Sequence, residues 1–396
     1  MPSDRITQLS IEGMRCIESI KLDLKDFTVL IGENGTGKSM IIEALELLRK
    51  AATESSLIGK VYERHDGTRL VRQGTTTMRI GVAIEGDGPT LTYSIRILRD
   101  ERYLSVNAEM IGEPSRMVNS GIVMWRTDST FSVFESDGTT ATKEGTPSSE
   151  ETVIAHARFL KVPQLERVQR ALASIEVYPP LDLRRTWSNA QASQTARSSN
   201  LVRSADRLEP GGTNLVNIYA ALRNQRNWKE TLGRLRVALG DIDDVLFLNE
   251  ATGGTQTIGL RWRNGLEVLL SGLSDGQVSV LALVAIQQLQ RPRPPSIVAI
   301  DEPETHLHPG LVARVALGLQ EMSEEIPVLV GTQSDAFLNE IQRPENDVVL
   351  CKLDEERRTV LLRPDREQLR DWLTELSGLG AMRSAGLQGV AFPANQ

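Results

Sequence analysis

The sequence has only two cysteines, Cys16 and Cys351, among 396 residues. So few and so widely separated thiols cannot build a disulfide framework or a zinc hook, and they favour a reducing compartment, the cytoplasm. No apolar run approaches the ~20 residues of a membrane span, and the start MPSDRITQLS lacks the apolar stretch of a signal peptide. The net charge of −7 excludes a globally basic protein, so nucleic acid could be bound only by a local patch.

The first third of the sequence predicts two kinds of sheet. RITQLSIEG (5–13) and FTVLI (27–31) read as strands, and the second runs into a glycine-rich loop followed by a helical pattern. From position 78 to about 134 apolar and polar residues alternate, which predicts an antiparallel β lobe. We therefore expect a first lobe over residues 1–135 that contains both features.

The rest of the sequence divides into two further regions. Helical patterns over 150–175 and 214–239 flank a polar segment, 187–212, and together they predict an inserted, mainly helical subdomain over 136–240. Residues 241–396 return to alternating strands and helices, which is typical of a sheet covered by helices.

Several arginines lie in or beside the polar segment. They can belong to a solvated loop, which is the more ordinary interpretation, or to a patch that contacts a phosphate backbone or a partner. The sequence leaves both readings open. The residues are Arg184, Arg185, Arg197, Arg203 and Arg207.

The stretch IGENGTGKSM (31–40) matches the phosphate-binding loop G-x-x-x-x-G-K-[ST], in the strand-to-helix context that this motif requires. Its glycines let backbone N–H groups and the helix N-terminus face the phosphates. Lys38 is expected to contact the β and γ phosphates, and Ser39 to ligate Mg²⁺. The residues expected to hold ATP here are Asn34, Gly35, Thr36, Gly37, Lys38 and Ser39.

The stretch SIVAIDEPE (296–304) is an apolar strand that ends in two acids. Asp301, at the strand end, is placed to hold Mg²⁺. Glu302, one residue later, is placed to orient or deprotonate the attacking water. Combined with Lys38, these acids predict a site that hydrolyses ATP with Mg²⁺ as cofactor.

The stretch LSDGQ (273–277) precedes a predicted helix and is similar to the signature of ABC ATPases, usually written LSGGQ. Ser274, Gly276 and Gln277, at the N-terminus of that helix, are expected to form a second anion cradle. Five residues alone are a weak signal. Their position between the phosphate-binding loop and the acidic strand makes the combination specific.

With these motifs in place, the chain resembles the RecF/SMC/OLD-type branch of ABC ATPases, in particular single-chain ATPases related to OLD and RecF that lack a TOPRIM domain. The resemblance is carried by ITQLSIEGMRCIESIKLDLKDFTVLIGENGTGKS, LEPGGTNLVNIYAALR, LSDGQVSVLALVAIQQLQRPRPPSIVAIDEPETHLHPG and REQLRDWLTELSGLGAMRSAGLQGV. It implies an α/β head with a mixed, mainly parallel sheet flanked by helices, an antiparallel β lobe and an inserted helical subdomain.

The resemblance also implies roles for individual residues. Ser274 and Gly276 would close on ATP held by another protomer, so that heads pair head to tail around two ATP molecules. Arg15 would contact nucleotide, although it can equally be a surface arginine, and Gln73 would be the Q-loop glutamine near the metal. The branch often carries a phosphate-sensing histidine where this chain has Gln333, which can donate a hydrogen bond but carries no charge. We therefore expect slow hydrolysis.

Two histidines follow the acidic strand in ETHLHP (304–309). His306 and His308 can replace the missing switch histidine or serve the structure. We favour a structural role, and a metal pair is not expected because no further ligands cluster nearby.

The resemblance implies a switch whose output lies outside this chain. OLD-related ATPases often belong to bacterial antiphage defence systems and act with a separately encoded effector, such as a nuclease. No acidic TOPRIM-like cluster follows RRTVLLRP (357–364), so no nuclease activity is expected in this chain. The expected assembly is a homodimer or a higher even-numbered oligomer. The alternatives are a RecF-like ATPase that binds DNA and, less favoured, the nucleotide-binding subunit of an ABC transporter.

Overall fold

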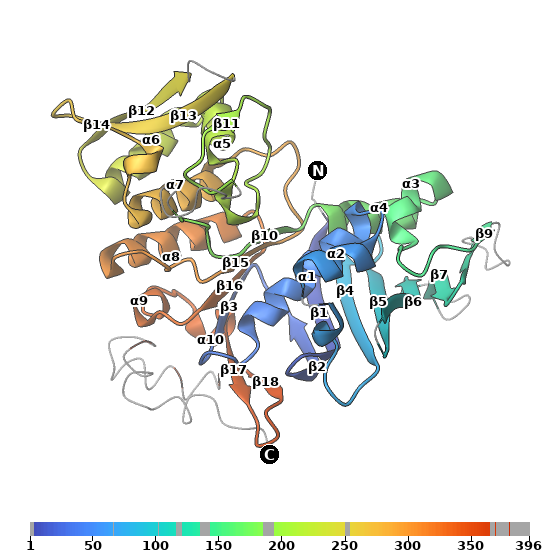
Figure 1. Ribbon diagram of the computed structural model, residues 1–396. Helices are drawn as coiled ribbons and strands as arrows, with labels where there is room; N and C mark the ends of the chain where they lie inside the picture. The colour runs from blue at the N-terminus through green and yellow to red at the C-terminus, as the bar shows by residue number, and fades with distance from the viewer. Residues whose placement is uncertain are drawn as a thin grey trace.

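The computed structural model describes residues 4–65, 67–101, 103–115, 121–134, 143–184, 194–249 and 254–364, together with Leu369 and Gly380. These residues form three sheets and the helices that pack on them (Figure 1). Within the described ranges, no helix combines the length and apolarity needed to cross a bilayer.

The antiparallel β lobe predicted from alternation is present as an eight-stranded sheet in the order β2-β1-β4-β5-β6-β7-β8-β9. Its central strands alternate buried and more exposed residues, because one face packs on the core and the other is turned outward. Its strands are β1 (Arg5–Met14), β2 (Ile17–Asp23), β4 (Thr77–Glu85), β5 (Leu91–Asp100), β6 (Tyr103–Gly112), β7 (Ile122–Thr127), β8 (Thr130–Val133) and β9 (Lys143–Gly145).

The second sheet has six strands in the order β10-β15-β16-β3-β17-β18, parallel except for β18. Its inner strands β3 and β16 are buried throughout and mostly apolar, as expected of a parallel sheet covered on both faces. This mixed α/β arrangement confirms the predicted fold class. The strands are β3 (Phe27–Ile31), β10 (Glu176–Tyr178), β15 (Val298–Asp301), β16 (Val328–Thr332), β17 (Val348–Leu353) and β18 (Thr359–Leu362).

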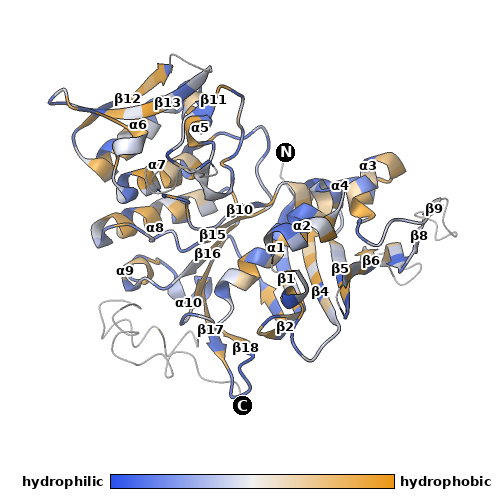
Figure 2. Ribbon diagram, viewed as in Figure 1, coloured by the Kyte–Doolittle hydropathy of each residue, from blue (hydrophilic) through white to orange (hydrophobic). Residues whose placement is uncertain are grey.

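Alternate residues of each parallel strand enter two different hydrophobic cores. Leu30 and Leu329 pack on one side with α1 (Lys38–Thr53) and the β lobe. Val29 and Val330 pack on the other side with α7 (Asp275–Gln288) and α8 (Pro309–Ser323). Figure 2 shows the central strands between helices that carry both orange and blue residues. The two motif-bearing helices, α1 and α7, therefore cover opposite faces of one sheet.

The helix predicted over 150–175 is interrupted. The structure has a turn of 3₁₀ helix (Ile154–His156), α3 (Ala157–Leu160) and α4 (Pro163–Ala173). Lys161 takes a left-handed φ of 54°, and Val162 is extended because it precedes a proline. Pro163, which has no N–H to donate, then starts the next helix at its first position. The pattern was read correctly as helical, but the break at Val162-Pro163 was missed.

The segment predicted as one inserted subdomain, 136–240, contributes to both halves of the molecule. Its α4 packs on α1, and β10 joins the parallel sheet, whereas α5 (Leu215–Arg223) and α6 (Trp228–Leu239) lie with α7. Those two helices accompany a third, antiparallel sheet at the upper left of Figure 1. Its strands are β11 (Asn200–Leu201), β12 (Ile242–Asn249), β13 (Thr255–Trp262) and β14 (Glu267–Leu269). Further helices in the described ranges are α2 (Leu57–Arg64), α9 (Asp335–Leu338) and α10 (Pro344–Asp347), and further turns of 3₁₀ helix there include Gly67–Leu70, Pro210–Gly212 and Leu270–Gly272.

Candidate nucleotide-binding site

Three neighbouring parallel strands bring the predicted catalytic residues to one edge of the sheet. The strands β15, β16 and β3 are adjacent, and the segments that carry Asp301, Gln333 and Lys38 stand at or just after their carboxyl ends. A Cβ built on Gly331 would lie 2.9 Å from Oδ1 of Asp301 and 3.8 Å from Cβ of Lys38. Lys38 and Asp301 therefore meet across a strand that has no side chain at that point, at the edge where open α/β sheets bind ligands.

The phosphate-binding loop after β3 has the backbone that its glycines predict. Gly35 and Gly37 have φ of 80° and 105°, a region that residues with a Cβ rarely adopt. Gly37 is also the N-cap of α1 and supplies no side chain to its first turn, which leaves those N–H groups for an anion. The Lys38 ammonium folds over the loop and donates to the carbonyl oxygens of Gly32 and Glu33, both at 2.8 Å.

Residues outside the motif brace this loop from β18 and the β1–β2 turn. Thr359 donates through Oγ1 to the Thr36 carbonyl at 3.0 Å, and the same Oγ1 lies 3.1 Å from Sγ of Cys16. A Cβ on Gly37 would approach the Thr359 hydroxyl to 2.6 Å, so the close packing itself requires glycine. Motif matching missed both braces, because they are distant in sequence and neither residue type is distinctive.

The residues expected to hold Mg²⁺ are brought together. Ser39, exposed at the start of α1, lies beside the Asp301 carboxylate, and Oδ1 of Asp301 is buried without a hydrogen-bond partner. Burial raises the pKa of the Asp301 carboxyl, and the neighbouring Ser39 hydroxyl opposes that shift. One hydroxyl and one carboxylate, beside an open phosphate position, are the oxygen donors that Mg²⁺ usually takes from proteins. The residues therefore fit the metal.

Glu302 and Gln333 are directly connected. Nε2 of Gln333 donates to Oε1 of Glu302 at 2.5 Å. Glu302 has a left-handed φ of 49°, and such strain in a non-glycine residue occurs mainly at functional sites. Glu304 was not assigned a role from the sequence. It fixes the carboxyl end of β16 by accepting hydrogen bonds from Thr332 Oγ1 at 2.7 Å and from the Gln333 N–H at 2.9 Å.

The signature residues form the N-terminus of α7. Ser274 is its N-cap and accepts from the N–H of Gln277, whose Oε1 in turn accepts from the N–H of Ser274 at 2.8 Å. This reciprocal pair is a capping box, so Gln277 serves the helix start itself. A Cβ on Gly276 would lie 2.9 Å from the His306 carbonyl, which places the signature against the segment that follows Glu302.

The histidines of ETHLHP have distinct places. His308 is the N-cap of α8, where its Nδ1 accepts from the N–H of Gly310 at 3.3 Å, a structural contact of the kind expected. His306 has a left-handed φ of 68° between the acidic strand and α8. Groups of three or more residues suited to a metal are not found among the side chains that the structure describes.

Arg15 and Gln73 are not joined to the other site residues by the hydrogen bonds described above. Arg15 is ion-paired with Glu43 of α1 at 3.0 Å. Gln73 is exposed on the turn that leads into β4. Their roles toward nucleotide and metal stay predictions.

The arginines of the polar segment differ in their surroundings. Arg184 pairs with Asp182 at 2.6 Å, and Arg203 pairs with Glu209 at 2.5 Å. Arg197 is buried, and Arg185 lies outside the described residues. Acidic partners and burial thus reduce the charge that Arg184, Arg197 and Arg203 offer to nucleic acid, whereas Arg207 is exposed.

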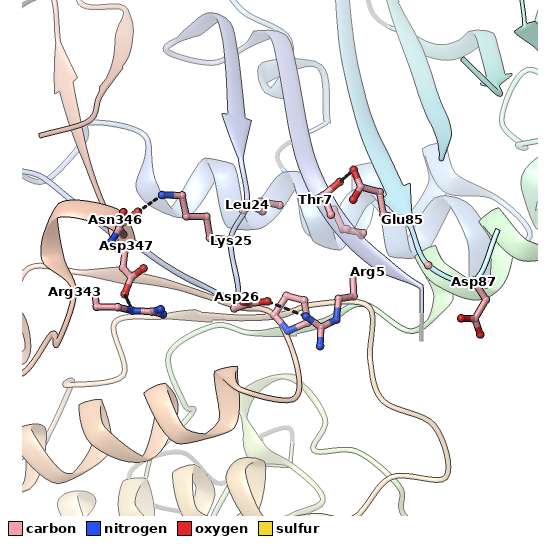
Figure 3. Close-up of a pocket in the computed structure, with 13 residues that line it drawn as sticks. Arg5, Thr7, Leu24, Lys25, Asp26, Glu85, Asp87, Arg343, Asn346 and Asp347 are labelled. Atoms are coloured by element: carbon pink, nitrogen blue, oxygen red, sulfur yellow. Dashed lines mark hydrogen bonds and ion pairs between the residues drawn. The ribbon is translucent and has the colours of Figure 1, made fainter. Parts of the chain in front are cut away.

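A cavity of about 770 Å³ lies away from these motifs, beside the starts of β1 and β3 (Figure 3). Its charged groups are largely paired with one another, as in Arg5 with Asp26 at 2.8 Å and Arg343 with Asp347 at 3.5 Å. It is at the opposite edge of the parallel sheet from the phosphate-binding loop, so it is not the nucleotide site.

The loop, the signature and the acidic strand on this fold define an ABC-type ATPase head of the RecF/SMC-like kind. A protein-family model described as "AAA domain, putative AbiEii toxin, Type IV TA system" matches residues 27–339, and the chain belongs to this family. No curated protein matches the sequence.

Solved structures with a similar fold include heads of Smc proteins. One, an Smc head bound to the C-winged helix domain of ScpA, is 12% identical with a TM-score of 0.55, over 93% of this chain and 99% of that chain. Another, the Smc head domain with an extended coiled coil bound to the C-terminal domain of ScpA derived from Pyrococcus furiosus, is 13% identical with a TM-score of 0.53, over 94% and 99%. At this identity the similarity shows the fold.

Replacing Gly331 by alanine tests whether the three strand ends form one site. The new Cβ would displace the Asp301 carboxylate, so we expect ATP hydrolysis, measured as phosphate release, to fall by about tenfold to a hundredfold. Gly233→Ala on α6 is the matched control, since its Cβ would meet no atom within 4 Å and activity should not change. A folded Gly331→Ala protein with the wild-type rate would contradict this assignment.

Proposed function

We propose that this chain binds and slowly hydrolyses ATP with Mg²⁺, that two copies pair head to tail around two ATP molecules, and that it regulates a separately encoded effector. One observation carries the proposal. Lys38 begins a helix on one face of the parallel sheet, and Ser274 caps a helix on the other face. A nucleotide held by Lys38 is therefore covered by the Ser274 of a second copy, as two-fold pairing allows.

Hydrolysis is assigned to the groups around Asp301. Glu302 orients or deprotonates the attacking water, and Gln333 holds the Glu302 carboxylate through its amide at 2.5 Å. Mg²⁺, held through Ser39 and Asp301, would neutralise charge on the phosphates. Gln333 supplies a hydrogen-bond donor without a positive charge, so transition-state stabilisation is weaker than with a protonated histidine and turnover is slow.

The regulatory role rests on less direct support. The family description refers to a putative toxin of a type IV toxin–antitoxin system, which is compatible with a part in antiphage defence. The Smc heads that share the fold were crystallised with a partner domain, so this fold can present a surface to another protein. We propose a nuclease as the effector and the ATP-closed dimer as the form that controls it. The alternative of a RecF-like DNA-binding ATPase gains no support from Arg184, Arg197 and Arg203, which are paired or buried.

Glu302→Gln should arrest the cycle with ATP bound, because the amide cannot deprotonate water but keeps the shape of the site. Gel filtration with light scattering should then show an ATP-dependent doubling of mass. Adding Ser274→Arg, which fills the proposed anion cradle, should keep the mass with ATP at the value measured without ATP. If ATP leaves the mass of Glu302→Gln unchanged, and the resting protein is not already a larger assembly, the paired-head proposal is wrong.

The same trapped protein tests the effector. Tagged Glu302→Gln, expressed in the native host and purified with ATP, should retain a nuclease that mass spectrometry identifies and that is reduced when Ser274→Arg is added. Recovery of duplex DNA without a protein partner, bound with strong salt dependence, would instead support the RecF-like alternative.

A further inference from the structure

The loop before the signature is held by a buried arginine from a distant part of the chain. The Arg197 side chain is 1% exposed. Its Nε donates to the Leu183 carbonyl at 3.0 Å, and Nη1 donates to the carbonyls of Leu270 at 3.3 Å and Leu273 at 2.6 Å. Its Nη2 binds the carboxylate of Asp275. The guanidinium thus reaches the loop, the residue before the N-cap and the first residue of α7.

Asp275 stands where the usual signature has glycine. It is the first residue of α7, next to Ser274, and its side chain is 46% exposed. A carboxylate suits a helix N-terminus, but this one would also face the phosphates that the cradle is proposed to bind. Two anions a few ångströms apart in a site closed from water repel each other strongly. A signature with aspartate therefore requires a compensating positive charge.

We propose that Arg197 is a positioning residue of the signature, which neutralises Asp275 and so allows the cradle to accept the phosphates of ATP held by a second copy. This inference rests on the head-to-tail pairing proposed above. Arg197 binds three backbone carbonyls and one carboxylate through three different nitrogens. A lysine, with three donors on a single nitrogen, cannot make these four contacts at once. Arg197 does not touch the nucleotide, and its effect passes through Asp275 and the loop.

A purely structural arginine would give different results. If Arg197 served only to bind the carbonyls of Leu270 and Leu273, its loss would loosen the loop whatever residue stood at position 275. If it neutralises Asp275, removal of the carboxylate should compensate for removal of the arginine. The two roles are therefore separated by a double-mutant cycle between positions 197 and 275.

The cycle is measured in the Glu302→Gln background by ATP-dependent dimerisation in analytical ultracentrifugation. We expect Arg197→Ala to weaken dimerisation about tenfold or more, because it leaves an uncompensated carboxylate at the interface. ATP binding by the monomer, measured with a fluorescent ATP analogue, should change less than about threefold, since the phosphate-binding loop is untouched. Asp275→Gly added to Arg197→Ala should restore dimerisation to within about threefold of the parent.

Two further variants keep the test informative if Arg197→Ala is unstable. Asp275→Asn alone should dimerise at least as tightly as the parent, because position 275 then places no anion beside the phosphates while the positive charge of Arg197 remains nearby. Arg203→Ala, in the same segment but exposed, should have no effect. Weaker dimerisation of Asp275→Asn, or no rescue of Arg197→Ala by Asp275→Gly, would overturn the inference alone. If the Glu302→Gln parent itself stays monomeric with ATP, both the paired-head proposal and the inference about Arg197 are wrong.

Discussion

The burial of one parallel sheet on both faces is the constraint on which the other features depend. Its strands are apolar on either side, so each face must be covered, and the covering helices are α1 and α7. Lys38, Asp301 and Gln333 stand at or beyond the ends of neighbouring parallel strands, which gathers them at the carboxyl edge. Because α1 follows the phosphate-binding loop and α7 begins at the signature, the same burial puts the two motifs on opposite faces of the sheet.

Irregular segments of the molecule are held by buried arginines. Arg126 is fully buried with Glu109 and also donates to the backbone carbonyls of Ser148 and Glu151, in the irregular segment that leads toward α3. Arg291 forms a bidentate pair with Glu176 of β10, at 2.6 and 2.7 Å. Arg197 holds the signature loop in the same manner. Burying a guanidinium is costly unless its donors are satisfied, so each site specifies one geometry for its loop.

Sequence reasoning succeeded where information is local. FTVLI, the alternating strands of the β lobe and the three motifs each specify their structure within a few residues, and strand order then brings Asp301 to Lys38. It failed where the local structure is determined by a contact between residues far apart in the sequence, or by a single residue. Pro163 starts a new helix where periodicity alone predicted a continuous one. Thr359 at the phosphate-binding loop and Arg197 at the signature left no local signal of these contacts.

The central claim is that each ATP site is shared between two copies, and mixing two inactive variants tests it most directly. Lys38→Ala removes the phosphate contact and Ser274→Arg blocks the cradle, so each protein alone should lack ATPase activity. In a head-to-tail heterodimer one site combines both defects and the other has none. Random mixing should therefore restore up to about a quarter of the wild-type rate, since half of the dimers carry one intact site of two. A mixture as inactive as its components, or a Ser274→Arg protein that hydrolyses ATP at the normal rate alone, would contradict the account.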